Sequence, residues 1–145
     1  MEKQRFVDKI ALVTGGANGL GRGMVDQLVK EGAQVAVFDI EDGTMEEAFA
    51  HNDRVCCLHC DVRDYDQVQK GVQDVIERYG RIDVLMNNAG IIHRQGFLEC
   101  SKEGWLDVMD TNLNGVFYVG QAVARTMVDL GVEGHIVNTC SNTSR

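Results

Sequence analysis

Proline is absent from the 145-residue sequence, and long apolar runs are absent as well. No window approaches the roughly 18 consecutive apolar residues of a transmembrane helix, so no membrane span is expected. Basic residues are few, with 14 Lys and Arg against 22 Asp and Glu, and the formal charge of −8 argues against a nucleic-acid-binding protein. The first residues also lack the apolar core of a signal peptide. The composition therefore predicts a cytoplasmic protein that binds neither membranes nor nucleic acid.

The cysteine count is odd, with five residues, and three of them fall within residues 56–60. In a reducing compartment these would be free thiols. Cys57 and Cys60 do have the Cys-x-x-Cys spacing of metal and redox sites, and His51 and His59 lie nearby in the sequence. Successive side chains of a strand point to opposite faces, however, so Cys57 and Cys60 should diverge. Buried free thiols are the favoured interpretation, and no metal site is expected.

Short apolar runs of strand length alternate with helical patterns along the whole chain. The expected strands are residues 10–14, 34–39, 55–60, 82–86 and 135–138. Apolar stripes predict helices around residues 24–29 and 64–79, closed by Gly32 and Gly80, and a long helix from about Ser101 to Leu130 in which Trp105 is a core anchor. Asp64 and Gln67 form an expected capping box. Strands alternating with helices predict a single α/β domain over residues 1–145, of the Rossmann type, with a doubly wound parallel sheet.

The clearest functional signal is a glycine-rich turn between the first expected strand and the following helix. Residues 14–21 read Thr-Gly-Gly-Ala-Asn-Gly-Leu-Gly, which lets the backbone approach a pyrophosphate at a helix N-terminus. Asp39 ends the next strand, 18 positions beyond Gly21, close to the spacing of an acid that binds the adenosine ribose hydroxyls. A carboxylate there repels a 2′-phosphate, so the pattern favours NAD(H) over NADP(H).

The glycine spacing, Gly15-x-x-x-Gly19-x-Gly21, resembles the short-chain dehydrogenase/reductase family. Further matches follow in the order of that family: Cys60-Asp61-Val62, Asn87-Asn88-Ala89-Gly90, Thr111-Asn112-Leu113 and the segment 135–141 ending in Ser141. The segments 87–99 and 121–125 are similar to dehydrogenases that act on gluconate or 2-dehydro-3-deoxygluconate. The resemblance covers essentially the whole chain, as the N-terminal portion of such an enzyme.

The resemblance implies an oxidoreductase that interconverts a secondary alcohol and a ketone of a small molecule, with NAD as cofactor. Ser141 and Asn112 occupy catalytic positions, in which the serine bonds the substrate oxygen and the asparagine holds a water. Arg94 stands near the substrate and could pair with a carboxylate. The positions that would bind the cofactor are Gly15, Asn18, Gly19, Leu20, Gly21, Asp39, Asp61, Val62, Asn88, Ala89 and Gly90. The family also commonly dimerises through the long helix, so a homo-oligomer, either a dimer or a tetramer, is expected.

One part of the family's chemistry has no counterpart in this sequence. The family places Tyr-x-x-x-Lys about a dozen residues beyond the serine, whereas the three tyrosines here, Tyr65, Tyr79 and Tyr118, precede it and have no lysine four positions later. They are interpreted as packing residues of helices. The chain is therefore expected to be incomplete, inactive by itself, and to expose its fifth strand as an apolar sheet edge. The alternative is a non-catalytic NAD-binding or assembly module.

Overall fold

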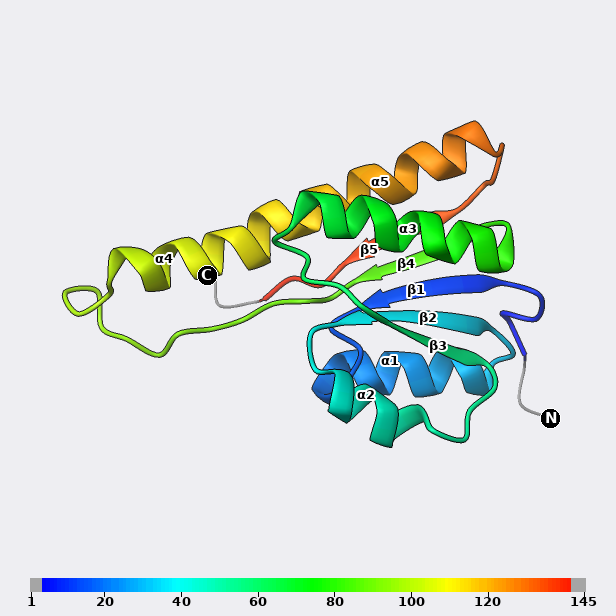
Figure 1. Ribbon diagram of the computed structural model, residues 1–145, viewed down its shortest axis with the longest axis horizontal. Coiled ribbons are helices and arrows are strands. Elements are labelled where there is room, and N and C mark those ends of the chain that lie inside the picture. Colours follow the sequence, from blue (N-terminus) through cyan, green and yellow to red (C-terminus); the bar gives the residue numbers. More distant parts are fainter. Residues whose placement is uncertain (1–3, 142–145) are drawn as a thin grey trace.

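The computed structural model describes residues 4–141, which contain one parallel five-stranded sheet (Figure 1). The strands are β1 (Ile10–Thr14), β2 (Gln34–Asp39), β3 (Val55–His59), β4 (Val84–Asn87) and β5 (His135–Asn138). Their order across the sheet is β3-β2-β1-β4-β5, and every neighbouring pair is parallel. This arrangement confirms the expected doubly wound α/β sheet. The strand order reverses between β1 and β4, where ligands of such sheets bind.

Helices cover both faces of the sheet. Helices α1 (Gly19–Lys30) and α2 (Asp42–Phe49) lie on one face, and α3 (Tyr65–Tyr79) and α5 (Val116–Asp129) lie on the other (Figure 1). Alternate residues of β1 enter the two cores: Leu12 packs with the α3 and α5 side chains, and Val13 packs with those of α1 and α2. The near-continuous apolar character of the central strands thus follows from burial on both faces.

Two of the local expectations need correction. The fourth strand begins at Val84 rather than residue 82, and the carboxylate of Asp83 accepts the backbone N–H of Ile10 at 3.0 Å. The capping box at α3 is only half formed. The Asp64 carboxylate accepts the N–H groups of Asp66 and Gln67, but the Gln67 side chain accepts the N–H of Asp61, because the Asp64 N–H already donates to the Asp61 carbonyl.

The long helix is continuous but changes its winding midway. Helix α4 (Lys102–Met109) runs into a π-helical segment, η1 (Asp110–Gly115), and then into α5. The side chain of Asn87 donates to the Val116 carbonyl at 2.8 Å, where the π-helical segment ends. Single π turns within α-helices are frequent at functional sites.

The outer part of this helix is more exposed than the apolar stripe predicted. Trp105 is 58% exposed, so its assignment as a core anchor is wrong, and α4 has no buried residue. Figure 1 shows the reason: α4 projects past the end of the sheet, and none of the strands within residues 4–141 lies beneath it. The tyrosines do act as packing residues, since the rings of Tyr65 and Tyr118 meet edge to face at 5.4 Å and join α3 to α5.

Strand β5 forms the expected apolar edge. All four of its residues are exposed, including Ile136 at 38% and Val137 at 46%. Helix α2 is an element that the apolar pattern did not identify, because only Met45 and Phe49 of its eight residues are buried. Among residues 4–141, no helix has both the length and the apolar character needed to cross a bilayer.

Candidate functional site

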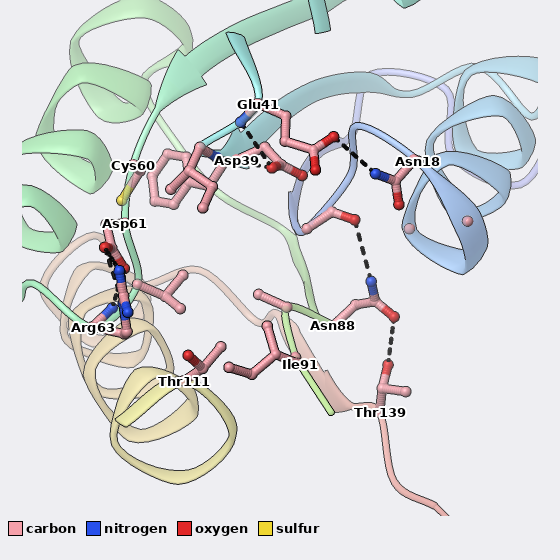
Figure 2. Close-up of a pocket in the computed structure, with 18 of the residues that line it drawn as sticks. Asn18, Asp39, Glu41, Cys60, Asp61, Arg63, Asn88, Ile91, Thr111 and Thr139 are labelled. Atoms are coloured by element: carbon pink, nitrogen blue, oxygen red, sulfur yellow. Dashed lines mark hydrogen bonds and ion pairs between the residues drawn. The ribbon is translucent and has the colours of Figure 1, made fainter. Parts of the chain in front are cut away.

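A cavity of about 700 Å³ opens at the carboxyl ends of β1, β2, β3 and β4 (Figure 2). It lies where the strand order reverses, as expected for a parallel sheet of this type. The structure brings all eleven predicted cofactor residues to its wall. These are Gly15, Asn18, Gly19, Leu20, Gly21, Asp39, Asp61, Val62, Asn88, Ala89 and Gly90.

The glycine turn between β1 and α1 leaves no room for side chains at two positions. A Cβ on Gly21 would overlap the Gly15 carbonyl oxygen, and one on Gly15 would lie 2.9 Å from the Ala89 Cα. Gly19, at φ +54°, has open space beside it instead. No acidic residue occupies the first turn of α1, and the Asn18 side chain makes no capping bond to it. The start of α1 therefore presents backbone N–H groups and a positive dipole end, which suits a pyrophosphate.

Asp39 holds the shape of the cavity beside this turn. Its Oδ2 accepts the backbone N–H of Ala17 at 3.0 Å, and its Oδ1 accepts that of Ile40 at 2.8 Å. Glu41, also on the wall, accepts a hydrogen bond from the Asn18 side chain at 3.0 Å. Two carboxylates therefore line this end of the cavity, which suits ribose hydroxyls and disfavours an additional phosphate.

Thr14 connects the glycine turn to the segment after β4. Its buried hydroxyl oxygen accepts the backbone N–H groups of Asn88 and Ala89, each at 2.9 Å. The Asn88 side chain in turn donates to the Thr14 carbonyl at 3.3 Å. It also accepts from the Thr139 hydroxyl at 3.2 Å (Figure 2). Asn88 thus ties β1, β4 and the residue after β5 together at the floor of the cavity.

Asn112 lies in the π-helical segment and makes a two-way contact with the loop after β4. Its side chain donates to the Ile91 carbonyl and accepts the Ile91 N–H, both at 2.8 Å. The side chain is therefore engaged in holding the loop. Ser141 and Arg94 are exposed, and neither belongs to the cavity wall described here. The structure thus places Asn112 in contact with a wall residue, Ile91.

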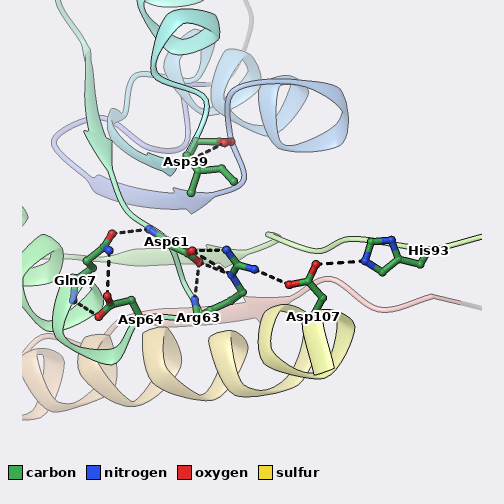
Figure 3. Close-up of polar contacts among 8 residues, drawn as sticks. Asp39, Asp61, Arg63, Asp64, Gln67, His93 and Asp107 are labelled. Atoms are coloured by element: carbon green, nitrogen blue, oxygen red, sulfur yellow. Dashed lines mark hydrogen bonds and ion pairs between the residues drawn. The ribbon is translucent and has the colours of Figure 1, made fainter. Parts of the chain in front are cut away.

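A connected row of polar side chains along the cavity was not identified from the sequence. Arg63 binds both carboxylate oxygens of Asp61, and its Nη1 donates to Asp107 Oδ1 at 2.6 Å. Asp107 Oδ2 lies 3.3 Å from Nε2 of His93 (Figure 3). The hydrogen bond from Arg63 lowers the pKa of Asp61 below its ordinary value. These residues come from three separate segments, and no motif in the sequence links them.

The cysteines are arranged as the strand pattern predicted. Cys57 packs against the core on the α1 and α2 face, whereas Cys60 belongs to the core on the opposite face. Burial raises the pKa of the Cys60 thiol to about 12, so this thiol is unreactive at neutral pH. Within residues 4–141 no cluster of three His, Cys, Asp or Glu side chains could hold a metal ion.

Comparison with known proteins places this geometry in one family. A family model described as short chain dehydrogenase matches residues 9–145. The chain is 36% identical to 2-dehydro-3-deoxy-D-gluconate 5-dehydrogenase of Dickeya dadantii over 94% of its length, and 41% identical to gluconate 5-dehydrogenase of Gluconobacter oxydans over 90%. It superposes with a TM-score of 0.89, at 34% identity and 95% coverage, on a short-chain type dehydrogenase/reductase from Mycobacterium marinum.

The same matches span only about half of each relative. The chain covers 54% of the Dickeya enzyme, 52% of the Gluconobacter enzyme and 57% of the Mycobacterium structure. The expected similarity to sugar-acid dehydrogenases is confirmed by the first two relatives.

Proposed function

The chain belongs to the short-chain dehydrogenase family, and from that premise we propose that its cavity binds NAD(H) in preference to NADP(H). The observation that carries the proposal is Asp39 at the end of β2, on the wall beside the glycine turn. A carboxylate there accepts hydrogen bonds from ribose hydroxyls and repels a 2′-phosphate. The basic residue that follows the turn supports the same preference. Arg22 bonds Asp26 at 3.1 Å and stacks 4.5 Å over the Phe49 ring, so its guanidinium is already engaged.

The proposed reaction is the interconversion of a secondary alcohol and a ketone in a small molecule, with a sugar acid as the proposed substrate. The bound nicotinamide would supply hydride transfer. Asn112 holds the loop after β4 through Ile91, which shapes the substrate end of the cavity. Ser141 is proposed to bond the substrate oxygen, and Arg94 to pair with a carboxylate. The two sugar-acid relatives support the choice of substrate class.

This chain by itself is proposed to bind the cofactor without turning over substrate. None of its tyrosines is followed by a lysine four residues later, so it carries no Tyr-x-x-x-Lys pair to exchange the proton. Gluconate with NAD⁺ should therefore yield no NADH in a preparation whose mass matches these 145 residues. Measurable turnover in such a preparation would contradict this part of the proposal.

The proposed assembly is a homo-oligomer, supported by the exposed apolar side chains of the long helix. Trp105 and Phe117 are each 58% exposed, and Leu113 is 57% exposed. Several large apolar side chains exposed along one helix favour an interface with another chain. The five free cysteines suit a reducing, cytoplasmic environment, which is the proposed location.

The cofactor preference is tested by calorimetric titration with NADH and with NADPH. The wild-type chain should bind NADH at least about tenfold more tightly, because each 1.4 kcal/mol of repulsion is a factor of ten. Asp39→Asn should reduce this ratio by removing the charge. Glu41→Gln is the matched control, with the same charge change two residues further on, and should reduce the ratio less.

Two results would overturn the preference. One is a wild-type chain that binds NADPH as well as NADH. The other is an equal response of the two variants, which would mean that Asp39 has no special role. A folded wild-type chain with no affinity for NADH would remove the proposal altogether.

A further inference from the structure

Helix α4 reaches the cavity although little apolar packing holds it there. It has no buried residue, and Trp105 and Leu106 are 58% and 44% exposed. Figure 1 shows it beyond the end of the sheet, at the far end of the loop that follows β4. The helix nevertheless supplies Asp107 to the cavity wall. Polar contacts of Asp107 therefore have unusual weight in setting where α4 lies.

Arg63 makes the shortest of these contacts. Its Nη1 donates to Asp107 Oδ1 at 2.6 Å, while its Nη2 donates to Asp61 Oδ2 at the same distance. The second oxygen of Asp107 lies 3.3 Å from His93 Nε2. The result is a connected row of side chains from the segment after β3, through α4, to the loop after β4 (Figure 3). A guanidinium can hold two carboxylates at once because its donors point in fixed, separate directions.

Arg63 has two candidate roles: it is a link that holds α4 in place, and it is a positive charge in the cavity wall. The wall includes four carboxylates, those of Asp39, Glu41, Asp61 and Asp107, and Arg63 is the one lysine or arginine among its described residues. A dinucleotide carries a negative pyrophosphate, so a positive charge in the wall would favour binding by itself. The two roles predict opposite responses to loss of Asp107. Loss of a negative charge should favour an anion, whereas loss of the link to α4 should weaken binding.

We propose that Arg63 is a positioning residue, which bridges Asp61 and Asp107 and so anchors α4 at the mouth of the cavity in the arrangement that binds the dinucleotide. This inference rests on the proposed function. The bridge acts through two other side chains, so Arg63 need not touch the nicotinamide or the substrate. Both carboxylates are partly exposed, at 23% for the Asp61 side chain and 42% for that of Asp107, so the bridge should weaken with salt.

The chain carries its own reporter of α4. Trp105 is the single tryptophan of the sequence and lies two residues before Asp107. Its fluorescence anisotropy, recorded without NADH, should fall in Asp107→Ala and in Arg63→Ala, because α4 then loses its link to the segment after β3. NADH affinity, measured by calorimetry, should fall about two- to fivefold in Asp107→Ala, the range of an exposed ion pair. Arg63→Ala should lose about tenfold, because it also releases Asp61.

Two further variants separate positioning from charge and from general stability. Arg63→Lys keeps the charge but not the fork, and should restore only part of the affinity. Glu103→Ala is the matched control, since it removes one carboxylate from the same helix but lies outside the cavity wall. It should leave both the anisotropy and the NADH affinity unchanged. The urea unfolding midpoints of all variants should agree. A loss of NADH affinity is then caused by loss of the Arg63 bridge and not by partial unfolding.

The decisive result is the direction of the change in Asp107→Ala. NADH binding equal to or tighter than that of the wild type would overturn the proposal, because Arg63 would then act through its charge alone. Unchanged Trp105 anisotropy in both alanine variants would also overturn it. Absence of NADH binding in the wild-type chain would instead defeat the proposed function, and the anisotropy would still decide whether Arg63 anchors α4.

Discussion

Within residues 4–141, the part of the sheet on the β2 side of β1 is more deeply buried than the part on the β4 side. On the side of β2, four consecutive strand residues from Val35 to Phe38 are buried, and α1 buries Gly21, Val25 and Leu28. On the side of β4, the outer strand β5 is exposed along its length and α4 buries nothing. The glycine turn lies on the well-packed side. Residues 4–141 therefore build the end of the cavity beside the glycine turn from local packing, whereas the end beside α4 depends on polar contacts of exposed segments.

The largest expected effect is a loss of stability, which should differ between an apolar residue of β1 and one of β5, on the β4 side. Leu12 in β1 has no exposed surface, and Leu12→Ala should lower the free energy of unfolding by about 2–5 kcal/mol because it leaves a cavity in a packed core. Ile136 in β5 is 38% exposed, and Ile136→Ala should cost under about 1.5 kcal/mol because part of its surface already meets water. Urea unfolding measures both. Equal losses would mean that β5 is as well packed as β1.

A second comparison concerns two glycines of α1. Gly21→Ala should cost about 3 kcal/mol of stability and abolish NADH binding, because the new methyl group would overlap the Gly15 carbonyl and lie 2.8 Å from the Asn88 side chain. Gly23→Ala is the matched control, since nothing lies within 4 Å of its Cβ position and alanine favours a helix. Urea unfolding and NADH titration of both variants provide the test. Unimpaired binding in Gly21→Ala would contradict the close approach at this turn.

Thr14 joins the two sides, and its removal should have an intermediate effect. Thr14→Val keeps the shape but leaves the N–H groups of Asn88 and Ala89 without their acceptor, which should cost about 1–3 kcal/mol. Thr14→Ser keeps the hydroxyl and should cost less. Chemical denaturation compares the two variants. A serine variant that is less stable than the valine variant would show that the methyl group, rather than the hydrogen bonds, matters here.

The smallest expected effect is a pH dependence of stability that comes from Glu31, on the well-packed side. Arg5 and Gln27 hydrogen-bond Glu31 and, with Arg5 as the larger cause, lower its pKa from 4.5 to about 2. The folded state thus binds this proton less readily than the unfolded state, so the stabilisation is present above pH 4.5 and is lost as the pH falls towards 2. Glu31→Gln and Arg5→Ala should both show a shallower fall in the urea midpoint between pH 5 and 2. Curves parallel to the wild type would contradict this pairing.

Much of the fold was predictable because its elements carry local signals. The bounds of β1, β2 and β5 agree with the expected ranges, and α3 begins after Asp64 and ends at Gly80, which has a φ of +79°. Helix α2 was missed because only two of its residues face the core. The exposure of Trp105 was missed because an apolar stripe shows which face of a helix could be buried, but not whether a partner lies beneath it.

The candidate site, like the fold, was predictable only in part. The glycine turn, Asp39, Asp61 and the segment 88–90 were all identified from sequence, and they meet at one cavity because parallel strands bring their carboxyl ends to the same edge. Their role in cofactor binding remains a prediction for the titrations to test. The contact among Arg63, Asp107 and His93 was not identified, because it joins three segments separated by up to 44 positions in the sequence.

By itself the sequence determined the alternation of strands and helices, the turn that requires glycine, and the carboxylate that ends β2. Each of these depends on neighbouring residues or on a short, regular spacing. Only the tertiary structure decided that the Asn112 side chain holds Ile91 and that Arg63 bridges two carboxylates. Such contacts form where segments that are distant in the sequence meet in the fold. No local sequence pattern specifies which segments meet.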